Sequence, residues 1–166
     1  MTRDNLVVWS YDSATANGNA DYEIEVHGVQ RLENGLTMIA ESGRARIIEV
    51  DQAGEIRHEV ALKVNHPPHP HQDTRQARKL PSGNYLVAHE RDQAVREYSP
   101  DGDVIWEYTV EVEPNPPPRP AGQPLYHGPE AHGPEGRGVA PYCAVRLTNG
   151  NTLIGTGRCV ALAQRL

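Results

Sequence analysis

The sequence predicts an all-β protein built from units of four antiparallel strands, as in the blades of a β-propeller. Three observations support this fold class. Residues 29–60 match residues 77–108 without a gap, short runs of Val, Ile, Thr, Tyr and Leu alternate with turn residues, and long helical periodicity is absent. The chain has 166 residues, including 15 Gly and 14 Pro, which fits one domain rich in turns.

The repeat aligns the two segments at an offset of 48 residues. Gly35 falls on Gly83, and the apolar positions around them match in type. A third copy, "LTNGNTLIG", carries the same turn at Gly150. The chain therefore contains three related units.

Each unit reads as four strands divided by tight turns. In the first unit we expect strands near 29–32, 36–41, 46–50 and 55–60, and in the second unit the same strands 48 residues later. The turns "ENG", "PSGN" and "PDG" support this division, because Gly tolerates a positive φ and Pro presets an early turn position. Four antiparallel strands in about 40–50 residues are typical of a propeller blade.

We interpret residues 1–166 as one partial propeller with an incomplete ring. Its parts are expected as blades at 26–60, 74–110 and 143–166 completed by 5–11, and as a loop insert rich in Pro, Gly and His at 111–141. The segment "NLVVWSY" resembles "DVIWEY", which is why it is predicted to be a fourth strand. Propellers have about four blades or more. Three blades therefore indicate that the chain is a truncated copy, that the remainder of the propeller is missing, or that two chains combine as a homodimer.

Composition excludes several function classes. The net charge is −6 and there is no run of Lys or Arg, so a nucleic-acid partner is not expected. No apolar window is long enough for a membrane span, and the N-terminal apolar run is too short for a signal peptide. A complete chain would thus be cytoplasmic. Cys143 and Cys159 match no zinc or CxxC spacing, which favours reduced thiols over a disulfide.

Strand order places the segments between blades and the second-to-third turns of each blade on one rim. That rim carries most of the histidines and several arginines, opposite the turns at Asn34, Ser82 and Asn149. We take the histidines as candidate catalytic groups and the arginines as candidate anion ligands. The candidates are His27, His71 and His89 as catalytic residues, and Arg44, Arg91, Arg158 and His69 as substrate-binding residues.

Simpler interpretations stay open at this point. A surface Arg or His is often only solvated, and His27 is equally consistent with a packed structural role. The insert motif "HGPEAHGPE" contains metal-ligand residue types, but its spacing matches no recognised zinc pattern, so no metal is expected.

The repeated segments resemble the blades of aryl-sulfate sulfotransferase-like propellers. "HGVQRLENGLTMIAESGRARIIEVDQAGEI" and "ARKLPSGNYLVAHERDQAVREYSPDGDVIWEY" carry this likeness, over about two thirds of the chain. Pyrroloquinoline-quinone-type propellers have broadly similar blades, but their "AxDxxTGxxxW" docking motif is missing. No cofactor is therefore expected.

The resemblance implies transfer of a sulfuryl group from a phenolic sulfate to another phenol through a histidine. His27 matches the histidine that opens the blade motif, while Arg75 and Tyr142 hold that position in the other blades. The Asp that usually follows this histidine is Gly28 here. A small anionic aromatic substrate is the expected ligand. The alternatives are a non-catalytic scaffold that binds a protein or carbohydrate, and an inactive truncated fragment.

Overall fold

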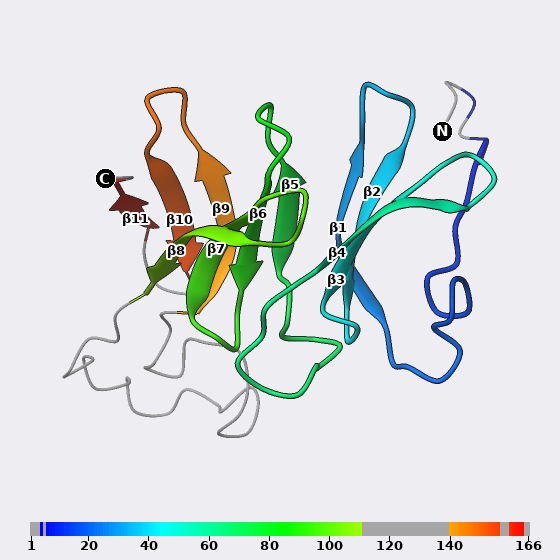
Figure 1. Ribbon diagram of the computed structural model, residues 1–166, viewed down its shortest axis with the longest axis horizontal. Helices are drawn as coiled ribbons and strands as arrows, with labels where there is room; N and C mark the ends of the chain where they lie inside the picture. The colour runs from blue at the N-terminus through cyan, green and yellow to red at the C-terminus, as the bar shows by residue number, and fades with distance from the viewer. Residues whose placement is uncertain (1–3, 5, 111–139, 157–159, 165–166) are drawn as a thin grey trace.

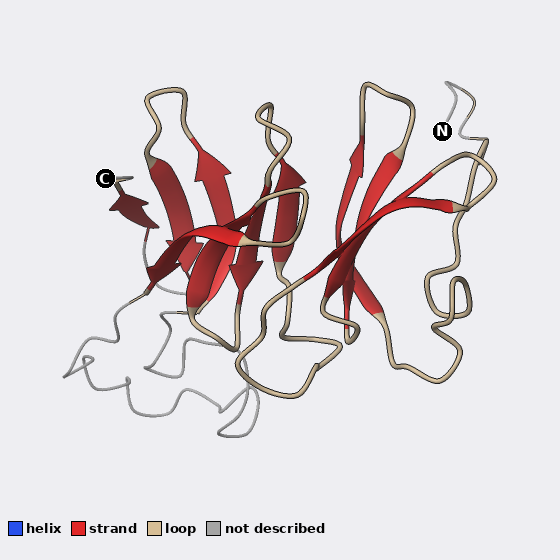
Figure 2. Cartoon of the chain, in the orientation of Figure 1, coloured by secondary structure: helices blue, strands red, loops and turns tan. Residues whose placement is uncertain are grey.

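The computed structural model describes residue 4 and residues 6–110, 140–156 and 160–164. Within these ranges the chain forms strands and loops but no helix (Figure 2). No helix in the described part is therefore available to cross a membrane. The strands are β1 (Glu25–Arg31), β2 (Thr37–Ser42), β3 (Arg46–Val50), β4 (Ile56–Ala61), β5 (Gln76–Lys79), β6 (Tyr85–His89), β7 (Ala94–Tyr98), β8 (Val104–Thr109), β9 (Pro141–Arg146), β10 (Thr152–Thr156) and β11 (Val160–Ala163).

The strands form three antiparallel sheets, which we call blades one, two and three. Blade one has the order β1-β2-β3-β4, blade two has the order β5-β6-β7-β8, and blade three contains β9, β10 and β11. The blades stand side by side, with the described segment that precedes β1 beside blade one and β11 at the far side of blade three (Figure 1). The all-β, propeller-like architecture with an open ring is thus confirmed, and the predicted strands of blades one and two match to within a few residues.

The same glycine turn joins the first two strands of each blade. Gly35, Gly83 and Gly150 have φ of 86°, 92° and 87°. Each donates its N–H to the carbonyl of the leucine three residues earlier. A residue with a Cβ rarely adopts this left-handed conformation, so the repeated Gly fixes the turn and the pairing that follows it.

The core lies between neighbouring blades. Met38, Ile47 and Val87 belong to the cluster between blades one and two. Leu86 and Ile154 belong to the cluster between blades two and three. The second and third strands of blades one and two are buried along their whole length. Blade two lies between two blades, whereas the outer face of blade one is packed by Trp9 and Tyr11. Burial of this apolar surface is the main force that holds the blades together.

The first strands of blades one and two approach each other closely. A Cβ on Gly28 would lie 3.0 Å from the backbone nitrogen of Ala77 in β5. The side-chain amide of Gln30 donates through Nε2 to the carbonyl of Lys79 and accepts from the Lys79 N–H through Oε1. Glycine at position 28 therefore allows β1 and β5 to pack side by side, which explains the departure from the motif that usually has Asp there.

In the described residues, segment 6–11 does not join blade three of its own chain, so the predicted completion of blade three within one chain is wrong. In the described chain the third sheet contains three strands. Trp9 and Tyr11 instead pack on Ile39, Ile48 and Val50 of blade one. The physical reason is distance, because the described segment before β1 and blade three lie at opposite ends of the row of blades (Figure 1).

The two ends of the blades carry different segments. The turns after β1, β5 and β9 lie at one end (Figure 1). The connector of residues 62–75 and the turns after β2 and β6 lie at the other end, which we call the connector rim. This is the division expected from strand order. The predicted insert at 111–141 lies almost wholly outside the described residues.

Candidate functional site

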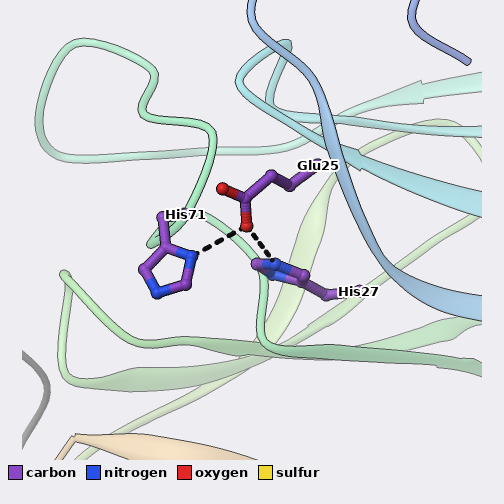
Figure 3. Close-up of side chains that lie close together, drawn as sticks. All are labelled: Glu25, His27 and His71. Atoms are coloured by element: carbon purple, nitrogen blue, oxygen red, sulfur yellow. Dashed lines mark hydrogen bonds and ion pairs between the residues drawn. The ribbon is translucent and has the colours of Figure 1, made fainter.

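Three side chains meet on the connector rim, and we call them the His27 centre. Glu25 and His27 come from β1, and His71 comes from the connector between blades one and two (Figure 3). One oxygen of Glu25 lies between the two imidazole rings, which are 5.6 Å apart by their centroids and nearly perpendicular. The centre therefore depends on two segments more than forty residues apart in sequence.

A β-bulge directs His27 towards this centre. Val26 pairs with Glu41 and Gly28 pairs with Ala40, so His27 is the extra residue in β1. A bulge bends its strand and changes the direction of the side chain, and bulges are common beside functional sites. Glu25 and His27 are two residues apart in β1 and therefore lie on the same side of the strand, and the bulge adjusts the direction of His27.

The His27 ring is held at both nitrogens. Its Nδ1 lies 2.5 Å from the carbonyl oxygen of Thr74, and its Nε2 lies 2.8 Å from Oε2 of Glu25. Because both partners are acceptors, Nδ1 carries the proton for Thr74, and a neutral ring then turns its Nε2 lone pair towards the carboxylate. A second proton or another positive group between Nε2 and Glu25 removes this conflict. The geometry therefore makes Nε2 the reactive nitrogen.

His71 completes the hydrogen bonding of Glu25. Its Nδ1 donates to Oε2 of Glu25 at 2.7 Å, and its Nε2 accepts from Nη2 of Arg75 at 3.1 Å. The Arg75 guanidinium in turn pairs with the buried Glu90. The hydrogen bond from His71, followed by the one from His27, holds the pKa of Glu25 below its ordinary value. Glu25 is thus a carboxylate poised between two imidazoles.

The connector is shaped by a buried carboxylate. Both oxygens of Asp73 accept from the backbone N–H of His69, at 2.9 and 2.8 Å, and Oδ2 also accepts from Gly43. Burial raises the pKa of Asp73, although these hydrogen bonds oppose the rise. His69 receives the N–H of His71 on its own Nδ1. His69 therefore positions His71, whereas the sequence analysis expected it to bind substrate.

The positions equivalent to His27 in the other blades lie nearby. Arg75 and Tyr142 align with His27 in blades two and three. Arg75 contacts His71, and its guanidinium carbon lies 5.3 Å from the Tyr142 ring centroid. Burial raises the pKa of the Tyr142 hydroxyl. The equivalent positions of the three blades thus carry an imidazole, a guanidinium and a phenol that lie near one another. This is expected where the first strands of neighbouring propeller blades meet.

The structure distributes the other predicted site residues differently. His89 is fully buried and its side chain faces the core. Arg44 donates to the carbonyl of Gly18, and its guanidinium carbon lies 4.1 Å from the Tyr22 ring centroid. Arg91 is exposed in the turn after β6. Arg158 lies outside the described residues. Of the predicted residues, the structure therefore brings together His27 and His71.

Two members of the site were missed by sequence reasoning. Glu25 precedes His27 by two residues, and Arg75 follows His71 by four. The available signal was Glu-x-His at the start of a first strand, but an acidic residue beside a histidine is too common to stand out. The relation of Glu25 to His71 appears only when blade one meets the connector.

The centre also has the composition of a metal site. Glu25, His27 and His71 each offer a ligand atom, and these atoms lie within 4.8 Å of one another. The Nδ1–H of His27 bonded to Thr74 is the type of contact that fixes the tautomer of a metal-binding histidine. The sequence analysis expected no metal, because it compared spacings along the chain and these ligands come from two segments.

Comparisons with known proteins establish the fold. No protein-family model and no curated protein matches the sequence. A solved protein of unknown function from Bacteroides caccae is 23% identical, with a TM-score of 0.57, and the match covers 84% of this chain and 42% of that one. A catalytically inactive histidine-to-alanine variant of virginiamycin B lyase from Staphylococcus aureus, solved with quinupristin, is 14% identical, with a TM-score of 0.51 and coverages of 86% and 42%.

These neighbours support a β-propeller scaffold, because virginiamycin B lyase belongs to a β-propeller family. The chain spans less than half the length of either neighbour. At this level of identity the likeness concerns the fold alone, and fold does not select an activity. The chain is therefore a partial propeller, and its chemistry has to be argued from the His27 centre.

Proposed function

We propose that this partial propeller is arylsulfotransferase-like and carries a sulfuryl group on Nε2 of His27. The observation that supports this proposal is the fixed His27 ring, whose Nδ1 is bonded to the Thr74 carbonyl while Nε2 faces Glu25. A histidine held in this way is a nucleophile with an adjacent base. Arg75 contacts His71 and offers a guanidinium for a sulfate oxygen, and the Tyr142 ring lies next to it.

Glu25 would handle the protons of the transfer. It first accepts the proton from Nε2 of His27, so that the free lone pair attacks the sulfur of an aryl sulfate. The S–O bond to the aryl group breaks, and the departing aryloxide takes the proton from Glu25. In the second step an acceptor phenol gives its proton to Glu25 and attacks the sulfur, and the N–S bond breaks. His71 donates to Glu25 throughout and keeps it in place.

The direct test is labelling of His27 in a single turnover. The chain is incubated with para-nitrophenyl sulfate without an acceptor, and nitrophenolate release and the mass of the peptide containing His27 are measured. We expect release and a mass increase of one sulfuryl group on His27. The cluster belongs wholly to this chain, so the first step can be followed even though the chain is shorter than its neighbours.

The matched control is His66, which lies on the same connector as His71 but outside the His27 centre. His27→Ala should lower nitrophenolate release by about 100-fold or more, whereas His66→Ala, which removes an exposed ring, should change it by less than about twofold. Absence of both release and label from folded wild-type protein would refute sulfuryl transfer.

The three ligand atoms favour a second candidate function, in which the His27 centre binds a divalent transition metal. Two imidazoles and a carboxylate are a ligand set suited to zinc or cobalt, with room for water or substrate as further ligands. Glu25 lowers the affinity of the centre for an anion but raises it for a cation. This electrostatic point distinguishes the second candidate from the first.

Cobalt absorption and zinc titration calorimetry separate the two candidates. Metal binding predicts one site, with affinity reduced about tenfold or more by Glu25→Gln, His27→Ala or His71→Ala and unchanged by His66→Ala. Bound zinc would occupy Nε2 and prevent labelling of His27. Labelling without metal binding supports sulfuryl transfer, metal binding without labelling supports the second candidate, and the absence of both leaves a non-catalytic scaffold.

A further inference from the structure

Residues 6–11 lie on blade one as a fourth strand of a preceding blade would. The rings of Trp9 and Tyr11 stack at a centroid distance of 6.2 Å with planes 12° apart. In β8, the rings of Trp106 and Tyr108 stack at 6.4 Å, also with planes 12° apart. The two segments align in sequence and present the same pair of stacked rings.

An arginine beside each pair of stacked rings extends this similarity. Arg31 ends β1, and its guanidinium carbon lies 5.8 Å from the Trp9 ring centroid. Arg146 ends β9, and its guanidinium carbon lies 4.7 Å from the Trp106 ring centroid. Since β8 is the fourth strand of the blade before β9, residues 6–11 have the position of a fourth strand in the blade before β1.

The described part of blade three contains no strand in the corresponding fourth position. Its described part has three strands, with β11 at the edge of the sheet. Apolar side chains on the outward face of its described strands are also exposed. Met38 and Leu86 face the next blade and are 0% and 2% exposed, whereas Leu153, at the same position of blade three, is 39% exposed. Val145, opposite Leu153, is 50% exposed. Apolar surface of this kind marks an interface.

Residues 6–11 and β11 do not pair within one chain, because they lie at opposite sides of the row of blades (Figure 1). We propose that residues 6–11 of one copy form the fourth strand of the β9–β11 sheet in a second copy, and that two copies close a six-bladed ring about a two-fold axis. Each copy then supplies the strand that the other lacks. This inference concerns assembly and does not depend on the proposed function.

The register at the new seam follows from blade two. There Leu86 of β6 pairs with Glu97 of β7, and Glu97 lies opposite Trp106 of β8. In blade three, Leu153 of β10 pairs with Leu162 of β11, so Leu162 holds the place of Glu97. The same alignment places Trp9 of the second copy opposite Leu162, and the next residue, Ser10, opposite Ala161.

Sedimentation equilibrium tests the assembly. We expect the purified chain to show twice the mass of one copy at high concentration and to dissociate on dilution. Trp9→Ala should raise the dimer dissociation constant about tenfold or more, since it removes a large side chain from both seams. A monomer at all concentrations, or a ladder of larger species without a dimer, would overturn the two-fold ring.

A disulfide tests the register. In a background with Cys143→Ser and Cys159→Ser, one chain carries Ser10→Cys and another carries Ala161→Cys. Mixed and oxidised, they should yield a disulfide-linked pair. Mixing Ser82→Cys, from the opposite rim, with Ala161→Cys is the control. Equal yields from the two mixtures would contradict the proposed strand pairing.

A gain of affinity tests the same register independently. At the seam between blades two and three, Nη2 of Arg146 lies 2.6 Å from Oε2 of Glu97. Leu162→Glu should recreate this pair with Arg31 of the second copy and tighten the dimer about fivefold. Arg31→Ala in the same chain should remove the gain. A Leu162→Glu change that leaves the dimer unchanged or weakens it would contradict the proposal.

Discussion

His27 and His89 are held by adjacent carbonyl groups of the same connector, yet they differ in what their other nitrogen meets. Nδ1 of His89 lies 2.7 Å from the carbonyl of Asp73, and Nδ1 of His27 lies 2.5 Å from the carbonyl of Thr74. Nε2 of His89 lies 2.9 Å from the Tyr98 hydroxyl in the core. Nε2 of His27 faces the Glu25 carboxylate at the rim.

The difference decides which histidine is reactive. A neutral His89 donates through Nδ1 and accepts the Tyr98 hydroxyl proton through Nε2, so its hydrogen bonding is complete without a charge. Burial lowers the pKa of His89 to about 4, and the nearby Arg96 cation adds to the effect. His27 reaches solvent and needs a positive charge beside its Nε2. The same residue type thus serves the fold in one position and chemistry in the other.

The largest expected effect is on stability, from removal of the buried ring. His89→Ala leaves a cavity and deprives Tyr98 and the Asp73 carbonyl of partners, so it should lower the free energy of unfolding by about 3–4 kcal/mol. His27→Ala should change it by less than about 1 kcal/mol. Urea unfolding followed by circular dichroism measures both. Equal losses would mean that His27 is also a structural histidine.

The pH dependence of stability should come next in size. The unfolded chain binds a proton on His89 as the pH falls through about 6.5, whereas the folded chain binds it only near pH 4. Stability should therefore fall between these values, by up to about 3 kcal/mol, and be fully present above them. Carboxylates whose pKa values are lowered in the fold lose their contribution in a more acidic range; they are Glu25, Asp51 and Glu107.

His89→Gln separates the histidine from these carboxylates. The amide keeps a donor and an acceptor but does not titrate in this range, so the slope between pH 6.5 and 4 should become much smaller. The measurement is the urea midpoint at several pH values. A slope that persists in His89→Gln would assign the pH dependence to other groups.

A moderate effect is expected at the contact between the first strands. Gly28→Ala places a methyl group 3.0 Å from the Ala77 backbone nitrogen, so β1 has to move away from β5. We expect a loss of about 1–2 kcal/mol in unfolding free energy and weaker labelling or metal binding at His27. The nuclear magnetic resonance signals of the His89 ring should keep their chemical shifts in this variant. A shift of the His89 signals as large as that of the His27 signals would contradict the view that the two histidines have independent surroundings.

The smallest effect is expected from removal of one hydroxyl. Tyr98→Phe deletes the donor to Nε2 of His89 and should cost about 1 kcal/mol in unfolding free energy. Because the His27 centre does not contact Tyr98, its labelling or metal affinity should stay within about twofold of wild type. Loss of activity in a folded Tyr98→Phe variant would show that the two histidines are coupled.

The sequence predicted the strands well because the signals are local. The repeat marks where each unit begins, and the turn glycines mark where strands end, as at Gly35 and Gly83. The predicted strand at 46–50 coincides with β3. The prediction that residues 6–11 join blade three of the same chain was wrong, because Trp9 identifies a fourth strand but does not say which sheet it joins.

The candidate site was predicted in part. His27 was found because first strands line the inner rim of a propeller, and His71 because the connector carries many histidines. Glu25 and Arg75 were missed because neither belongs to a recognisable spacing, and the arginine at 44 was selected only for its position in a turn. His89 looked like a rim residue because it ends β6, while burial of its side chain depends on Tyr98 from a different strand.

By itself the sequence determined the repeated unit, its strand order, its glycine turns and the rim to which each loop belongs, since these depend on residues close together in the chain. The tertiary structure alone decided what each histidine does. A bulge in β1, the contact of β1 with β5 and the path of the connector bring Glu25, His27 and His71 together. These contacts depend on how the blades pack. Packing is the sum of many small free energies over the whole interface, so it leaves no local pattern in the sequence.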